Sequence, residues 1–146
     1  SVMGSVVSAT TGRAYGDFAA PRKADTFLFA AEALLADAHK EFSAGHYDLA
    51  LENAYRAALR IAGARNAQSA VLRKRKRLPT NAWDKLALTG DDGVRWAQEF
   101  SAYSAQRGRV ASGIEDNPSP VVVSGLIGAV EEFYLETTGG GGALAA

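Results

Sequence analysis

Apolar side chains recur every three or four residues in several stretches of the chain, with polar or charged positions between them. This spacing places them on one face of an α-helix. It predicts long helices over residues 25–43, 46–64, 94–107 and 120–136, and a short helix over residues 81–88. The sequence therefore predicts an all-α fold, an up-down bundle of four main helices plus a short connecting helix.

The ends of the predicted helices carry residues suited to those positions. Asp25 is an expected N-cap of the first helix, and Asp91 or Asp92 is expected to cap the helix that follows. Gly45 is expected to end the first helix, because glycine adopts a positive φ without a Cβ clash. The gap after Gly45 is so short that the first two helices must form an antiparallel hairpin.

The last helix carries two glycines in its interior, Gly125 and Gly128, where each costs about 1 kcal/mol relative to alanine. We expect them to pack closely against a neighbouring helix. Val122, Leu126, Ala129, Val130 and Phe133 are expected to face inward, and Trp83 and Leu86 are expected to anchor the short helix.

The 146 residues are expected to form one domain. Residues 1–20 read as a flexible arm, residues 21–137 as the helical bundle, and residues 138–146 as a flexible Gly/Ala tail. We find no cysteine, no signal peptide and no apolar run of membrane-spanning length, so a cytoplasmic protein without membrane contact is expected.

The formal net charge of the chain is zero, but its basic and acidic residues are distributed unevenly along the sequence. Residues 53–83 contain no acidic residue but eight bases. Five of these bases are consecutive: Arg73, Lys74, Arg75, Lys76 and Arg77. A segment of this kind attracts phosphate backbones, and the binding depends on salt. Solvated or paired charge is the first alternative, and an anionic membrane is a weaker one.

The residues offer little for catalysis or metal binding. His39 and His46 do not form a ligand pair, no cysteine could complete a zinc site, and no phosphate-binding glycine loop occurs. The adjacent carboxylates at 91–92, 115–116 and 131–132 are expected to cap helices or cover surfaces. We therefore expect no metal and no cofactor.

The stretch "FSAGHYDLALENAYRAALRIAGA" is similar to two known patterns. Gly45, Tyr47, Ala50, Ala54 and Ala57 match the spacing of a tetratricopeptide repeat, although no second copy follows. The stretch also resembles the first hairpin of the HEPN superfamily, the higher eukaryote and prokaryote nucleotide-binding domains. There the matching residues are Gly45, Tyr47, Ala50, Ala54 and Ala58, and the resemblance extends over about residues 24–137.

Many HEPN domains are metal-independent ribonucleases with an Arg-x4–6-His motif at the end of the third long helix. Arg107 or Arg109 stands where the arginine belongs, but no histidine follows either residue at that spacing. The resemblance therefore implies a non-catalytic member or one that uses a different site, with Arg107 and Arg109 as candidates for phosphate binding. It also implies a dimer, formed through the face that bears the arginine motif.

Three functions follow as hypotheses. The first is a domain that binds RNA, a nucleotide or a nucleic-acid-handling partner through residues 73–77, Arg107 and Arg109. The second is a protein–protein adaptor whose basic run meets an acidic partner. An exposed Trp83 or Trp96 beside the bases would favour nucleic acid, and burial of both would favour the adaptor. The third is a ribonuclease with an unusual site drawn from Arg107, Glu115 and Asp116.

Overall fold

The computed structural model describes the backbone of residues 12–139 and the side chains of residues 22–139. Over this range the chain forms helices and no strand, which confirms the predicted all-α class. The helices are α2 (Gly12–Ser43), α3 (Tyr47–Gln68), α4 (Ala70–Lys74), α5 (Ala82–Ala87), α6 (Asp91–Ser101), α7 (Ser104–Ala111) and α8 (Pro120–Thr137).

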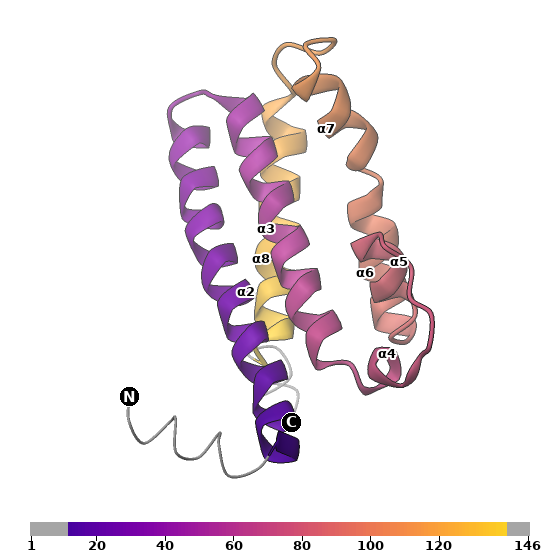
Figure 1. The fold of residues 1–146 in the computed structure, drawn as a ribbon. Helices are drawn as coiled ribbons and strands as arrows, with labels where there is room; N and C mark the ends of the chain where they lie inside the picture. Colours follow the sequence, from indigo (N-terminus) through magenta and orange to yellow (C-terminus); the bar gives the residue numbers. More distant parts are fainter. Residues whose placement is uncertain (1–11, 140–146) are drawn as a thin grey trace.

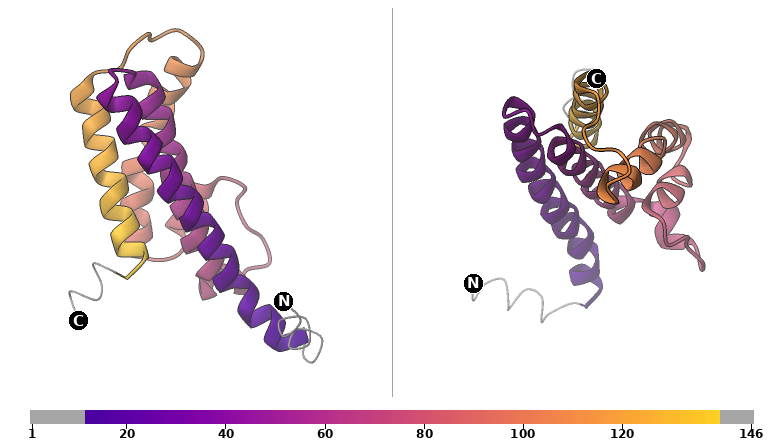
Figure 2. Two further views of the ribbon diagram at one scale, coloured as in Figure 1. Left: turned by 90° about the vertical axis from the view of Figure 1, so that its left-hand side faces the viewer. Right: turned by 90° about the horizontal axis from the view of Figure 1, so that it is seen from above.

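Helices α2, α3 and α8 run alongside one another, and α5, α6 and α7 cover the other side of α3 (Figure 1). Seen along the bundle, α8 stands out from the row formed by the other long helices (Figure 2). Gly45 has a φ of +81°, and the His46 N–H donates to the Glu41 carbonyl oxygen at 2.9 Å. The predicted glycine stop and the antiparallel hairpin of α2 and α3 are therefore confirmed.

Small side chains bring α2 and α3 close together. Six alanines of α3 are fully buried, and α2 contributes Ala31 and Ala38 to the same contact. Gly63 serves this packing directly, because a Cβ at that position would lie 3.0 Å from the ring of Phe27. The alanine-rich sequence of the hairpin thus allows the two helix axes to approach closely.

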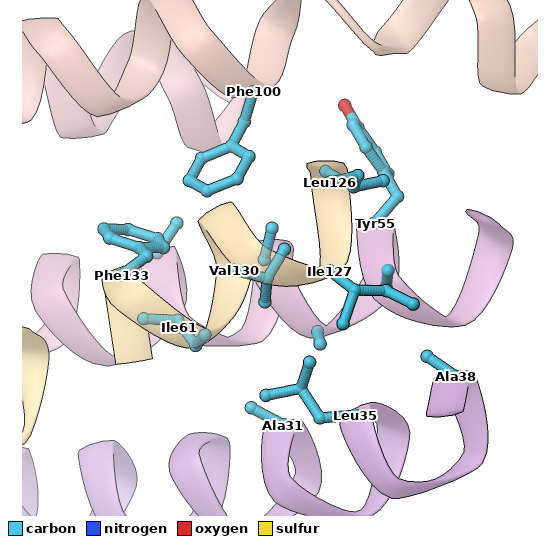
Figure 3. Packing of buried hydrophobic residues seen from close by; sticks show 14 of the residues in the cluster. Ala31, Leu35, Ala38, Tyr55, Ile61, Phe100, Leu126, Ile127, Val130 and Phe133 are labelled. Carbon is cyan, nitrogen blue, oxygen red and sulfur yellow. The ribbon is translucent and has the colours of Figure 1, made fainter. Parts of the chain in front are cut away.

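Aromatic rings form part of the core between α3, α5, α6 and α8. Figure 3 shows Tyr55, Phe100 and Phe133 among aliphatic side chains of this core. Phe100 stacks on Trp83 and Trp96, with ring centroids 5.4 Å apart in both pairs, and Phe133 lies 5.0 Å from Phe100. The Trp83 indole N–H donates to the Tyr55 hydroxyl at 2.8 Å, which satisfies a buried polar group. Trp83 and Leu86 anchor α5 as the sequence predicts.

Helix α2 begins at Gly12, well before the predicted start at Asp25. Residues 12–20, expected in the flexible arm, are therefore helical, whereas residues 1–11 and 140–146 lie outside the described part. This end of α2 extends beyond the rest of the bundle (Figure 2). A helix that projects beyond its neighbours needs no apolar stripe, so the periodicity that we used could not detect it.

The helix predicted over residues 94–107 is in fact two helices, α6 and α7. Between them the Tyr103 N–H donates to the Phe100 carbonyl three residues back, at 3.0 Å, which tightens the turn. The expected aspartate cap is also wrong, because Gly90 is the N-cap of α6 and Asp91 and Asp92 lie in its first turn.

Helix α8 corrects two further expectations. Val123 is buried, whereas Val122, expected inside, is 36% exposed. Gly125 and Gly128 do not pack against a neighbour in the described part of the chain, since a Cβ at either position would meet none of its atoms within 4 Å. Leu126, Val130 and Phe133 are buried as predicted, and Ala129 is half-buried. In the described part of the chain, no helix is both long enough and apolar enough to cross a membrane.

Candidate anion-binding surface

The five consecutive bases form a surface segment that we call the basic segment, residues 73–77. Arg73 and Lys74 end α4, and the other three lie in the non-helical connection to α5. Ser69 caps α4 by accepting a hydrogen bond from the Leu72 N–H at 3.2 Å, and buried Leu72 fixes the helix on the bundle. The fold thus holds the start of the segment through Leu72 and directs the bases outward.

All five side chains of the basic segment are exposed. Among the described residues none of them forms an ion pair, and the Arg75 guanidinium donates to the Arg77 carbonyl oxygen at 3.4 Å. Five positive charges on consecutive residues repel one another, and no acidic side chain of residues 22–139 pairs with them. The segment is therefore a concentrated positive surface.

A groove of about 570 Å³ lies beside the basic segment and brings two further lysines to it. Its lining combines apolar side chains with three cations, Lys23 of α2, Arg73 of α4 and Lys85 of α5. The sequence does not indicate that Lys23 and Lys85 belong to this surface, because they are distant from each other along the chain. Only the packing of α2 and α5 on α3 brings them together. Like the basic segment, both lack an ion pair within the described range.

Arg107 lies in α7, away from the basic segment, and is paired with a carboxylate. Its Nε and one terminal nitrogen donate to the two carboxylate oxygens of Glu52, each at 2.8 Å. The guanidinium also lies 5.2 Å from the centroid of the Tyr55 ring. The hydrogen bond from Arg107 holds the pKa of Glu52 below its ordinary value, although burial acts in the opposite direction. Arg107 thus joins α7 to α3 as half of a bidentate ion pair.

Arg109 also faces a carboxylate, since its Nε lies 3.4 Å from Glu115. Both arginines belong to α7, at the opposite end of the bundle from α4 (Figure 1). Arg107 contacts Glu52 near the start of α3, whereas α4 follows the end of α3 at Gln68, about 24 Å further along the helix. The predicted site residues therefore do not form one face, and only residues 73–77 gather with other unneutralised cations.

Two other arginines of the acid-free stretch are also neutralised by carboxylates. Arg56 donates to Glu52 at 2.6 Å, and Arg65 donates to Asp92 at 2.6 Å and to the Thr137 hydroxyl at 2.7 Å. Burial raises the pKa of Asp92, but hydrogen bonds from Arg65 and Arg95 outweigh it and leave the pKa lowered. The contacts of Arg65 connect α3 to α6 and α8, whereas the Arg56–Glu52 pair lies within α3.

Neither tryptophan is available for base stacking, because Trp83 is 5% exposed and Trp96 is 1% exposed. The histidines lie at the surface, as expected. His39 Nε2 lies 2.7 Å from Glu131, and His46 Nδ1 lies 3.5 Å from Glu41. Within residues 22–139 no cluster of three metal-ligating side chains is present.

The carboxylates proposed for an unusual ribonuclease site are not assembled around Arg107. Glu115 accepts hydrogen bonds from Gln106 at 2.9 Å and from Arg109 at 3.4 Å, while Arg107 is held by Glu52. The basic segment can bind an anion by its charge. At the α7 end of the bundle, Arg107 and Arg109 are already paired with carboxylates of the chain.

Comparison with known proteins agrees with this architecture. No curated protein and no solved structure matches the chain. A family model described as SAV_6107-like HEPN matches residues 49–137, which is more than half of the chain and spans α3 to α8. The chain therefore belongs to the SAV_6107-like HEPN family, within the superfamily that its first hairpin resembles.

Proposed function

We propose that this protein binds RNA through the basic segment and the lysines of the adjacent groove. The observation that carries the proposal is the group of seven cations without an ion pair in the described structure, Lys23, Lys85 and residues 73–77. RNA presents closely spaced phosphates, and binding by such a surface is electrostatic and largely independent of sequence. Membership of a superfamily named for nucleotide binding supports this choice of polyanion.

The proposal assigns binding, and not cleavage, to this domain. In the ribonucleases of the superfamily the motif arginine contacts the scissile phosphate, whereas here Arg107 makes a bidentate contact with Glu52. The sequence offers no histidine at the motif spacing after Arg107 or Arg109. RNA cleavage without metal that is lost in Arg107→Ala would contradict this assignment.

The test is a titration of a fluorescent single-stranded RNA, with anisotropy as the readout. A variant with residues 73–77 all changed to Gln is compared with wild type. The double variant Arg107→Gln/Arg109→Gln is the matched control, because it makes the same kind of substitution at the other end of the bundle. We expect the first variant to lose most of the affinity and the control to keep it. Equal losses in both variants would contradict the proposal.

Burial of Trp83 and Trp96 favours a second candidate, an adaptor that binds an acidic protein segment through the same cations. The adaptor would not be a tetratricopeptide repeat. Such a repeat places two helices in about 34 residues, whereas α2 and α3 contain 32 and 22 residues and are together much longer. An acidic peptide of equal charge, titrated beside the RNA, separates the two functions. The adaptor is supported if the peptide binds and the RNA does not.

A further inference from the structure

The groove beside the basic segment has an apolar lining that charge attraction alone does not require. Four apolar side chains from α2, α3, α4 and the connection to α5 contribute to it: Phe27, Leu59, Leu72 and Leu78. Leu72 is buried, whereas Leu78, the residue directly after the basic segment, is 44% exposed. The volume of about 570 Å³ lies within the roughly 300–1,000 Å³ that is typical of sites for small molecules. The groove thus has room for a group the size of a nucleobase.

Phe27 supplies an aromatic ring to this lining. The ring is half-buried, and a Cβ at Gly63 would lie 3.0 Å from it, so the ring lies directly against the backbone of α3. An aromatic ring held in one place is a surface on which an unstacked base packs, and such a contact does not depend on the identity of the base. Phe27 thus offers a contact that the buried Trp83 and Trp96 do not offer.

Positive charge accompanies the apolar lining. Lys23, Arg73 and Lys85 line the groove from α2, α4 and α5, and none of the described lining residues is acidic. Arg73 is also the first residue of the basic segment, so the groove and the segment are continuous. A ligand that fits both features joins an apolar group to a negative charge. A nucleotide of RNA does so, because its base is linked to a phosphate through one ribose.

An amide side chain of the groove has an unused hydrogen-bonding group. The Asn66 side-chain nitrogen donates to the Ala82 carbonyl oxygen at 3.3 Å, which fixes the orientation of the amide. The side-chain oxygen of Asn66 is buried and has no hydrogen-bond partner in the described part of the chain. An unsatisfied buried acceptor costs stability, so a partner is expected. Asn66 lines the groove, and the N–H groups at the edge of an RNA base are donors of the kind that this oxygen lacks.

We propose that this groove holds one unstacked base of a single-stranded RNA, while the adjacent phosphates contact the basic segment. The inference rests on the proposed function, and it adds a contact that depends on the base as well as on charge. The bases of an intact duplex are stacked and paired, so they cannot enter the groove. The bound RNA is therefore single-stranded at this position. The groove should accept any of the four bases, because stacking tolerates differences in sequence.

The test compares two fluorescent RNA strands of the same length, one normal and one whose riboses carry no bases, with anisotropy as the readout. Both strands carry the same phosphates, so the electrostatic part of binding cancels in the ratio of their affinities. We expect the full chain to bind the normal strand at least about fivefold more tightly. Binding of neither strand overturns the proposed function and this inference together. Equal binding of the two strands overturns this inference alone.

Two exposed aliphatic residues, one on either side of the basic segment, provide matched variants. Leu78 follows the segment and lines the groove, whereas Val71 precedes it, is 48% exposed and does not line the groove. We expect Leu78→Ser to lower the preference for the normal strand at least about threefold, because apolar contact with the base is lost. Val71→Ser should leave the preference unchanged. A preference that Leu78→Ser does not lower, or that both variants lower equally, overturns the inference.

An acidic protein segment is the competing occupant of the groove. It is represented by a leucine-containing acidic peptide with the same charge as the RNA. We expect the normal strand to bind more tightly than this peptide, because the peptide offers no flat base to the Phe27 ring. Tighter binding of the peptide, weakened by Leu78→Ser, would assign the groove to a protein partner and overturn the inference.

Discussion

Arg107 and Glu52 form a bidentate ion pair, with two nitrogen–oxygen distances of 2.8 Å, that connects α7 to the first turns of α3. The same carboxylate accepts a hydrogen bond from Arg56 at 2.6 Å. The arginine that the superfamily resemblance would place on a phosphate is therefore occupied by a carboxylate of its own chain. The pair supports a role of Arg107 in the stability of the bundle, in agreement with our proposal that the basic segment binds the anion.

Removing the Glu52 charge should lower stability. We expect Glu52→Gln to reduce the free energy of unfolding at pH 7 by about 1–2 kcal/mol, because two arginines lose a partly buried charged acceptor. Denaturant unfolding measures this loss. Arg109→Ala is the control and should cost less than about 0.5 kcal/mol, because its contact with Glu115 is longer and more exposed.

The effect of Glu52 should also depend on pH. The pKa of Glu52 is lowered in the folded state, mainly by the hydrogen bond from Arg107. Its contribution to stability is therefore fully present above the unfolded pKa of about 4.3 and is lost as pH falls through the lower folded value. The stability difference between wild type and Glu52→Gln should shrink as pH falls below about 4.3. A difference that stays constant over this range would contradict the ion-pair account.

The Tyr55 hydroxyl should stabilise the fold, because it accepts a hydrogen bond from the buried Trp83 indole N–H. Tyr55 is 4% exposed, and its hydroxyl is the only acceptor that the described residues offer to the Trp83 indole N–H. Tyr55→Phe should cost about 1–3 kcal/mol, since the indole loses its partner without regaining water. Urea unfolding checks the loss. Tyr103→Phe is a suitable control, because no described contact depends on its hydroxyl, and equal losses in the two variants would argue against the buried hydrogen bond.

Two helical glycines should respond in opposite ways to alanine. At Gly93 a Cβ would lie 2.1 Å from the Leu86 carbonyl oxygen, where backbone must move. We expect Gly93→Ala to destabilise the fold by about 2–3 kcal/mol. At Gly108 in α7 the space is open, so Gly108→Ala should stabilise by up to about 1 kcal/mol. Thermal unfolding of both variants tests the packing of α6 on α5, and a tolerated Gly93→Ala would contradict it.

Sequence periodicity predicted the parts of this fold in which one helix face is buried. The α2–α3 hairpin, the stop at Gly45 and the anchor Trp83 follow from local patterns, and the structure confirms them. The N-terminal end of α2 escaped prediction because it projects beyond the core and carries no stripe. The break at Tyr103 escaped because the backbone on either side remains helical, so the sequence pattern continues across it.

The candidate site was predictable only where it is contiguous in sequence. Residues 73–77 are visible as a run, and the structure places them on the surface. Lys23 and Lys85 join them only through tertiary packing. The pairing of Arg107 with Glu52 could not be predicted, because the two residues are 55 positions apart and single-sequence patterns do not reveal such pairs. Gly125 and Gly128 were expected to pack closely against a neighbouring helix, but a Cβ at either position would meet no described atom within 4 Å.

The most direct test of the central claim is the salt dependence of RNA binding. Each phosphate neutralised on a single strand contributes about −0.7 to the slope of log K against log salt, so one contact for each of the seven proposed cations predicts a slope of roughly −4.9. The account predicts this slope for wild type and for Arg107→Gln/Arg109→Gln, and a slope of roughly −1.4 when residues 73–77 are all Gln, because Lys23 and Lys85 remain. A wild-type slope near zero, or a slope that neutralisation of the basic segment leaves unchanged, would contradict it.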